Sequence, residues 1–264
     1  MAIYRVEYKS KTLKKSVRFS AIIPNDVSIS TKKKYSHSYE RDTKTLFLLH
    51  GYNGDETTFL KSTPVKEYSE KYNLAIILPS CRNSYYLNLN DSKDGYQTFI
   101  TKELVEYVRL AFNLSKDRED TIIGGVSMGG YGALHSALFS CNTYSKVIAI
   151  SPALIIEDLR SPNPDFSHGN YHFLVKTFGN FEKLNTSDSN YKVLFDKNIE
   201  NGYKNPDIFI AVGIDDFLLE GCRDFRNFLK ERTTRFSYIE DEGIHSHSFL
   251  LDYLETAIKW SVKN

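Results

Sequence analysis

The chain has 264 residues, of which 41% are hydrophobic and 25% are charged, and its formal net charge is +1 at pH 7. These proportions are typical of a globular protein and exclude a disordered or fibrous chain, and a net charge near zero argues against nucleic acid as the main partner. The longest apolar runs, at 74–79 and 208–212, are far too short to span a bilayer, so we expect no membrane association.

The N-terminal region predicts an antiparallel pair of strands. Residues 17–23 alternate into an apolar strand, and residues 4–8 can pair with it through a turn around 11–14. No secretory signal is visible, because charged residues interrupt any apolar stretch near the N-terminus. We therefore expect a cytoplasmic protein with an antiparallel edge at the beginning of its sheet.

Short β-rich runs then alternate with helical patterns along the chain. Strands are predicted at 45–49, 74–78, 121–126, 146–150, 207–212 and 236–239, and helices at 65–72, 98–112, 128–139, 217–231 and 248–262. Strands that alternate with helices imply βαβ crossovers. The pattern predicts an α/β fold with a mostly parallel central sheet, an antiparallel N-terminal edge and helices on both faces.

Residues 155–205 break this alternation with a proline-containing stretch, short helical patches and several aromatic residues. We interpret them as an insertion, or small cap, over the carboxyl ends of the strands, where open α/β sheets bind ligands. The aromatics could line an acyl pocket or form a small core of their own, and the second reading is favoured for most of them. We expect the whole chain, 1–264, to be one domain.

The strand at 121–126 ends in the motif G-x-S-x-G, at Gly125, Ser127 and Gly129, and opens into a helix. In this nucleophile elbow the serine occupies a tight, strained turn, and side chains at the two glycines would clash with neighbouring backbone. The motif predicts that Ser127 is a nucleophile. The alternative is a tightly packed glycine-rich turn without chemistry.

A serine hydroxyl needs a base within hydrogen-bond reach and an acid that orients the base. In this architecture the order along the chain is serine, acid, histidine. Asp215 and Asp216 follow the strand at 207–212, and His245 and His247 follow the last strand. The spacing alone leaves open which member of each pair acts.

The tetrahedral intermediate of acyl transfer also needs preorganised N–H donors. One comes from the residue after the nucleophile, here Met128, and one from the loop after an early strand, here the H-G-Y-N-G run at 50–54. We expect the backbone of Tyr52 to supply the second donor and Gly51 to contact substrate. His50 is expected to orient this loop by hydrogen bonding and to take no proton in the reaction.

Three widely spaced cysteines, Cys81, Cys141 and Cys222, fit neither a disulfide framework nor a metal or redox motif. No other metal-binding motif is present in the sequence. We therefore expect reduced cysteines, no metal and no cofactor.

The chain resembles the tributyrin esterase group of the esterase D-like α/β hydrolases, and more distantly the S-formylglutathione hydrolases and the feruloyl and acetyl xylan esterases. The similarity covers nearly the whole length and includes H-G-Y-N-G at 50–54, S-M-G-G-Y-G at 127–132, D-F-L at 216–218 and G-I-H at 243–245. It implies an α/β-hydrolase fold, with Ser127 as nucleophile, Asp216 as acid and His245 as base. Relatives commonly carry an aromatic, often Trp, two residues after the base, where His247 stands here. We expect His247 to line the leaving-group side of the substrate site.

These features predict a serine carboxylesterase that hydrolyses short-chain acyl esters, from acetyl to butyryl, through an acyl-enzyme intermediate. A thioesterase similar to S-formylglutathione hydrolases, or an acyltransferase, could use the same residues. A non-catalytic binding protein on the same fold is the third interpretation. The sequence identifies neither the physiological ester nor the oligomeric state.

Overall fold

The computed structural model describes residues 2–88, 95–161 and 170–263. Its strands are β1 (Ala2–Lys9), β2 (Ser16–Ile23), β3 (Lys44–Leu49), β4 (Leu74–Pro79), β5 (Thr121–Val126), β6 (Lys146–Ile150), β7 (Asp207–Gly213) and β8 (Phe236–Asp241). Its α-helices are α1 (Ile29–Lys34), α2 (Ser36–Tyr39), α3 (Thr58–Ser62), α4 (Val65–Tyr72), α5 (Tyr96–Thr98), α6 (Leu104–Phe112), α7 (Met128–Phe139), α8 (Ile156–Leu159), α9 (Tyr171–Phe178), α10 (Tyr191–Glu200), α11 (Leu219–Lys230) and α12 (His247–Val262).

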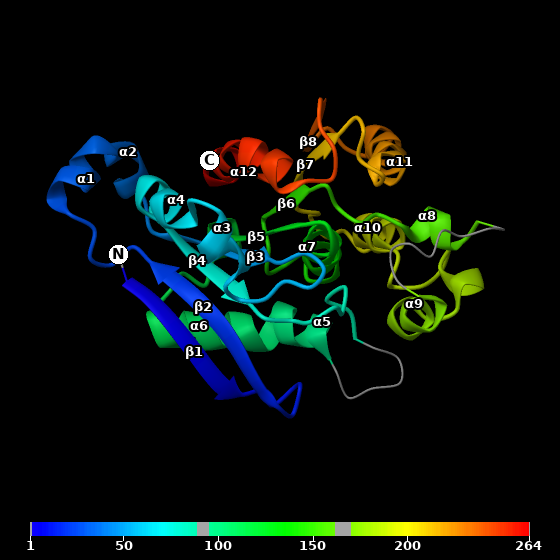
Figure 1. The fold of residues 1–264 in the computed structure, drawn as a ribbon, viewed down its shortest axis with the longest axis horizontal. Helices are drawn as coiled ribbons and strands as arrows, with labels where there is room; N and C mark the ends of the chain where they lie inside the picture. The colour runs from blue at the N-terminus through cyan, green and yellow to red at the C-terminus, as the bar shows by residue number, and fades with distance from the viewer. Residues whose placement is uncertain (1, 89–94, 162–169, 264) are drawn as a thin grey trace.

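The eight strands form one sheet in the order β1-β2-β4-β3-β5-β6-β7-β8. β1 pairs antiparallel with β2, and β2 pairs antiparallel with β4, whereas every later neighbour is parallel. The predicted parallel sheet with an antiparallel N-terminal edge is therefore confirmed. Since β5 lies in the middle, its carboxyl end and the loop after β3 meet at the same edge of the sheet (Figure 1).

Helices cover both faces of the sheet, as predicted, because alternate strand residues are apolar on both sides. In β3, Leu46 and Leu48 join the core beneath α3, α4 and α12, whereas Phe47 and Leu49 join the larger core that includes α6, α7 and α11. Figure 1 shows α4 and α12 on one side of the strands and α6 on the other. A period of two along each buried strand thus fixes a three-layer arrangement.

The sequence missed three short helices and part of a fourth. α1 and α2 contain no buried residue, so they have no apolar periodicity to detect, and α3 spans only 5 residues. The helix expected at 98–112 begins at Tyr96 and contains a π-helical turn at Phe99–Glu103. Within that turn Glu103 accepts hydrogen bonds from Ser10, Lys11 and Thr12 in the β1–β2 turn.

Between β6 and β7 the described residues form α8, α9, a 3₁₀ turn at Phe181–Lys183 and α10. Phe178, Tyr191 and Phe195 are buried in the larger core, whereas Tyr171 is exposed. Phe166 lies outside the described residues. Most of the described aromatics of this segment therefore pack as core, but they join the larger core and do not form the small separate core that the sequence favoured.

All three cysteines are buried and unpaired. Within the described ranges, no helix combines the length and apolar character that crossing a membrane requires.

The buried His135 lies in α7, away from the carboxyl edge of the sheet where the motif residues lie. Its Nε2 lies 2.7 Å from the carbonyl oxygen of Asp188, while its Nδ1 is buried and has no hydrogen-bond partner among the described residues. Burial lowers the pKa of His135 from 6.5 to about 4. The ring is therefore neutral in the folded protein at neutral pH, and it stacks against Tyr131 and Phe139.

The unfolded chain binds a proton at His135 more readily than the folded chain. We therefore predict that this histidine lowers the free energy of unfolding as the pH falls. The contribution of His135 to the free energy of unfolding is complete above its pKa in the unfolded chain. It falls as the pH drops toward its pKa in the folded chain. The free energy of unfolding should decrease by about 2 kcal/mol between pH 7 and pH 5 through this histidine. Urea unfolding at both pH values measures this change. His135→Gln should weaken the dependence, and an unchanged pH dependence in that variant would contradict the assignment.

Candidate active site

Ser127 occupies a sharp turn between β5 and α7, with φ 57° and ψ −121°. The turn requires glycine at both flanking positions. A Cβ atom on Gly125 would lie 2.3 Å from the carbonyl oxygen of Gly129, and one on Gly129 would lie 2.2 Å from that of Leu49. This close backbone approach, expected from the G-x-S-x-G motif, presents the Ser127 side chain at the carboxyl edge of the sheet.

Two loops bring an imidazole and a carboxylate to Ser127. The Nε2 atom of His245, in the β8–α12 loop, lies 3.1 Å from Ser127 Oγ. The Nδ1 atom of the same ring lies 3.0 Å and 3.1 Å from the two carboxylate oxygens of Asp216, in the β7–α11 loop. The structure thus brings together Ser127, His245 and Asp216, in hydrogen-bond contact along one line.

Asp216 and Asp215 have different environments. The Asp216 side chain is fully buried, whereas Asp215 is exposed in the turn. Burial opposes ionisation of Asp216, but hydrogen bonds from His245 and the Leu218 N–H, and the nearby Ser151 hydroxyl, hold its pKa below the usual range. Asp216 is therefore an ionised acceptor for the His245 ring.

The ionised carboxylate determines the tautomer of His245. Because Asp216 can only accept, Nδ1 carries the ring proton and Nε2 is left as an acceptor for the Ser127 hydroxyl. This arrangement can remove a proton from Ser127 as its oxygen attacks and return the proton to a leaving group.

The loop after β3 and the beginning of α7 both adjoin Ser127, since a Cβ atom on Gly51 would lie 3.6 Å from the Cβ of Ser127. Met128 is the first residue of α7, so its N–H has no acceptor within the helix. In the loop, His50 is buried, accepts from the Cys81 N–H at Nε2 and donates from Nδ1 to the Gly51 carbonyl. Burial lowers the pKa of His50. Its neutral ring orients the loop that contains Tyr52.

Two further contacts hold the same loop. Asn53 has φ 60° and exchanges hydrogen bonds of 2.7 Å and 2.8 Å with the side chain of Asn83. The Tyr86 hydroxyl donates to the His50 carbonyl over 2.9 Å. These contacts fix the backbone on both sides of Tyr52.

A cavity of about 680 Å³ opens at Ser127. Gly51 and Tyr52 line it, together with His247 at the beginning of α12. The Nε2 atom of His247 lies 2.7 Å from the carbonyl oxygen of Ser62, so this ring joins the beginning of α12 to the end of α3. His247 is therefore at the cavity wall, away from the hydrogen-bonded line of Ser127, His245 and Asp216.

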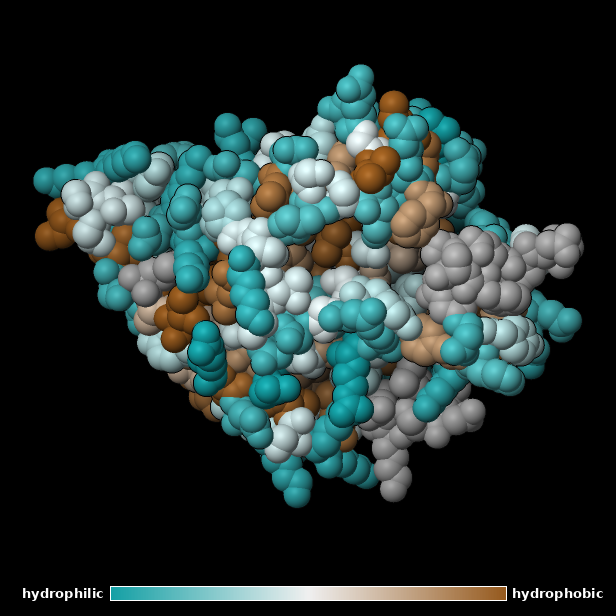
Figure 2. Space-filling view, viewed as in Figure 1, coloured by the Kyte–Doolittle hydropathy of each residue, from teal (hydrophilic) through white to brown (hydrophobic). Residues whose placement is uncertain are grey.

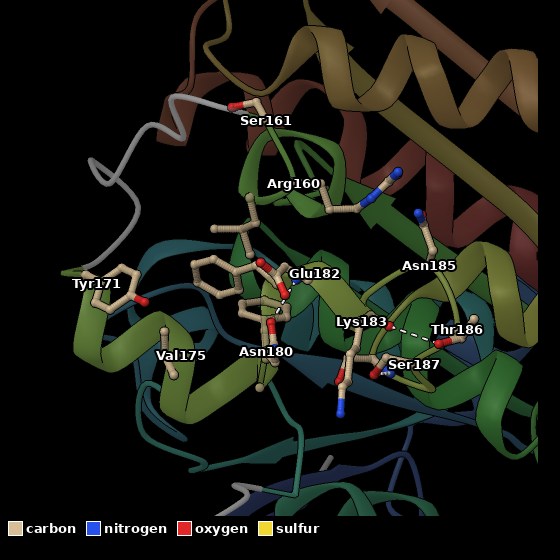
Figure 3. Close-up of a pocket in the computed structure, with 15 residues that line it drawn as sticks. Arg160, Ser161, Tyr171, Val175, Asn180, Glu182, Lys183, Asn185, Thr186 and Ser187 are labelled. Carbon is tan, nitrogen blue, oxygen red and sulfur yellow. Dashed lines mark hydrogen bonds between the residues drawn. The ribbon is translucent and has the colours of Figure 1, made fainter.

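A second hollow, of about 1100 Å³, lies among α8, α9 and the segment after α9 (Figure 3). Its described lining includes Arg160, Glu182 and Lys183 but none of the residues around Ser127. Arg160 is paired with Glu157. We locate the candidate active site in the smaller cavity, because only that cavity holds an oriented nucleophile and base.

In the described part of the chain, no group of three or more His, Cys, Asp or Glu side chains is placed to hold a metal ion. The groups that the structure places in hydrogen-bond contact at Ser127 are a hydroxyl, an imidazole and a carboxylate.

Sequence reasoning missed Ser151, Asn83 and Tyr86. Ser151 directly follows β6, has φ 43° and is buried beside Asp216. Its place at the carboxyl end of a central strand was the available signal. Asn83 and Tyr86 follow β4 in a segment without a periodic pattern, so nothing in the sequence predicts their contacts with the loop after β3.

Comparisons with known proteins identify the family of the chain. Residues 20–250 match the model of the family described as putative esterase. An acetyl esterase of Caldicellulosiruptor saccharolyticus is 36% identical over 100% of this chain and 99% of its own length.

Solved structures are similar over the whole chain. The fluorophosphonate-binding serine hydrolase F of Staphylococcus aureus has a TM-score of 0.84 and 26% identity, covering 100% of this chain and 99% of that one. An S-formylglutathione hydrolase from Staphylococcus aureus has a TM-score of 0.82 and 28% identity, covering 99% of each chain.

We predict that Asp216→Asn lowers kcat/KM for p-nitrophenyl acetate by about 10³- to 10⁴-fold, because an amide cannot hold His245 in the required tautomer. Asp215→Asn, at the exposed neighbouring position, should lower it by less than about tenfold. Initial rates give kcat/KM for both variants, and circular dichroism checks that both are folded. Equal losses in the two folded variants would contradict the assignment of Asp216.

Proposed function

Because this chain belongs to the putative esterase family, we propose that it hydrolyses short-chain acyl esters through a covalent intermediate on Ser127. The chain is a serine carboxylesterase, and its substrates are small-molecule esters. The observation that carries the mechanistic proposal is the hydrogen-bonded line from Asp216 through His245 to Ser127 Oγ.

In the proposed acylation step, Ser127 Oγ attacks the ester carbonyl carbon while its proton moves to His245 Nε2. The Tyr52 and Met128 N–H groups donate to the oxyanion that forms. The bond between the carbonyl carbon and the alcohol oxygen then breaks, and His245 returns its proton to the leaving alcohol. Asp216 stabilises the transient imidazolium.

In the proposed deacylation step, water takes the place of the alcohol. His245 accepts a proton from the attacking water, and the tetrahedral intermediate again forms opposite the same N–H groups. The Ser127–acyl bond breaks, Ser127 regains its proton from His245, and the carboxylic acid leaves.

The walls around Ser127 support a short acyl group. Tyr85, Met128 and Ala153 line one part of the cavity, and all three are buried. Behind Tyr85 the rings of Phe178 and Tyr131 lie with centroids 4.9 Å and 5.5 Å away. We place the acyl group against this aromatic end, which is backed by packed side chains and has little room to extend.

The segment 155–205 packs against two residues of the cavity wall. Phe173 of α9 contacts the rings of Tyr52 and Tyr85, with centroids 5.9 Å and 6.3 Å apart. We propose that this segment covers one side of the substrate cavity within a single 1–264 domain.

We also propose that the protein is located in the cytoplasm, which fractionation of cells would test.

A thioesterase is the second candidate function, because the S-formylglutathione hydrolase structure is 28% identical to this chain. The proposed steps are the same for a thiol leaving group. Rates for an ester and its thioester with the same acyl group decide which leaving group the enzyme prefers.

We predict that p-nitrophenyl acetate and butyrate are hydrolysed, and that kcat/KM for the octanoate is lower than for butyrate by roughly tenfold or more, since an overlong chain must displace packed rings. Ser127→Ala should reduce all rates by about 10⁴-fold or more. Ferulate serves as the aromatic comparison. Free acid should equal released nitrophenol, and transfer of the acyl group to added alcohol in place of water would identify an acyltransferase.

Octanoate turnover that equals butyrate turnover would contradict the short acyl site. Activities that persist undiminished in Ser127→Ala would contradict the proposed nucleophile.

A further inference from the structure

Exposed apolar side chains gather on the two loops that carry Asp216 and His245. Ile214, Phe217 and Ile244 are 44%, 65% and 59% exposed. Scattered exposed apolar residues are ordinary. Here Phe217 lines the cavity at Ser127, and Ile214 and Ile244 lie on the same two loops, so the exposed group adjoins a binding cavity. Figure 2 shows hydrophobic atoms among hydrophilic ones over the region where Figure 1 places β7, β8 and the beginning of α12.

Backbone hydrogen bonds show that these residues belong to one surface. The Ile214 N–H donates to the Asp241 carbonyl over 2.9 Å, and the Asp215 N–H donates to the Gly243 carbonyl over 3.0 Å. The Phe217 ring lies 4.6 Å from the His245 ring, measured between centroids, and also lines the cavity. We call this surface, formed by 214–217 and 241–244, the mouth rim.

The charged groups of the mouth rim are all acidic. Asp215, Asp241 and Glu242 are exposed. Asp241 accepts from the Tyr253 hydroxyl and the Glu242 N–H, contacts that favour its ionised form. The arginines that come next along α11, Arg223 and Arg226, pair with Glu240 instead.

The described lining of the cavity contains neither lysine nor arginine. A negatively charged group that leaves the cavity beside Phe217 would lie near the loops that carry these three carboxylates, and it would find no lysine or arginine in the described lining. An apolar, uncharged group would contact the exposed side chains of Ile214, Phe217 and Ile244. A cation near the carboxylates would be attracted.

Resting on the proposed esterase function, we propose that the mouth rim selects the leaving alcohol. It accepts apolar alcohols that are neutral or cationic and rejects those that carry a negative charge. Selection acts on the alcohol because the proposed acyl site is the buried wall at Tyr85, whereas the rim lies on the open side, around His245, which returns the proton to the alcohol.

Three acetate esters test the charge preference. Their alcohols are phenols with a para methylene group that carries a carboxylate, a carboxamide or a trimethylammonium group. The methylene keeps the three leaving groups similar in reactivity. The rates of uncatalysed hydrolysis correct for the difference in reactivity that remains. All three esters form the same acetyl-enzyme, so kcat/KM reports only binding and acylation.

We expect kcat/KM for the anionic ester to be roughly three- to tenfold below that of the neutral ester at low salt, and the gap to close at about 0.5 M salt. The double variant Asp215→Asn/Glu242→Gln should bring the two rates together. Glu200→Gln, an exposed carboxylate at the end of α10, is the matched control and should leave the ratio as in the wild type.

The apolar part of the mouth rim is tested with phenyl acetate and 4-butylphenyl acetate. Ile214→Ser should lower the preference for the butyl compound by roughly fivefold, as expected for loss of a modest apolar contact. Ile199→Ser is the control, because Ile199 is 50% exposed on α10.

An anionic ester that is hydrolysed as fast as the neutral one would overturn the proposal, as would an equal change of ratio in the Glu200→Gln control. Failure of the proposed function is distinguishable, because then the neutral ester itself would show no Ser127-dependent turnover.

Discussion

The backbone of Ser127 is held in a conformation that L-residues rarely adopt, and the geometry of the candidate site depends on it. Its φ is 57°, and four backbone hydrogen bonds fix it: its N–H donates to the Ile150 carbonyl, and its own carbonyl accepts from the N–H groups of Gly130, Tyr131 and Ala153. Such a conformation persists only where the surroundings determine it. Here the chain passes so close to itself, at Gly125 and Gly129, that no side chain fits at either position. The same turn points the Ser127 hydroxyl toward His245 and starts α7 at Met128, whose N–H has no acceptor within the helix.

The partners of Ser127 come from loops that the parallel sheet brings together. β7 and β8 are neighbours, so the loops that follow them lie side by side and share backbone hydrogen bonds at Ile214 and Asp215. Gly213 and Gly243 make this approach possible, since a Cβ on Gly213 would lie 2.2 Å from the Gly243 carbonyl oxygen. Burial raises the pKa of Asp216, and the hydrogen-bond donors around it outweigh this effect and lower the pKa below its usual range. One set of loops therefore positions the base, keeps its acid ionised and carries the surface that we propose selects the alcohol.

Much of the fold follows from the sequence because its strands are buried on both faces, and unbroken apolar runs that alternate with helices are typical of a parallel sheet covered on both sides. The family and the esterase class were also predicted, from motifs whose spacing reflects backbone contacts. The choice between Asp215 and Asp216 was not available from spacing, because the two residues are adjacent and only the turn decides which one is buried. α1 and α2 escaped prediction because they bury nothing. Ser151, Asn83 and Tyr86 act through contacts between distant segments, and such contacts leave no local pattern.

The most direct test of the account is the identity of the side chain that becomes covalently modified. The enzyme would be treated with a fluorophosphonate ester, digested and mapped by mass spectrometry, in the wild type and in His245→Ala. We predict a single adduct on Ser127, formed roughly 100-fold or more slowly without His245, since general base catalysis of this kind contributes about 10²- to 10⁴-fold. An adduct on another residue, or undiminished labelling of Ser127 without His245, would contradict the account.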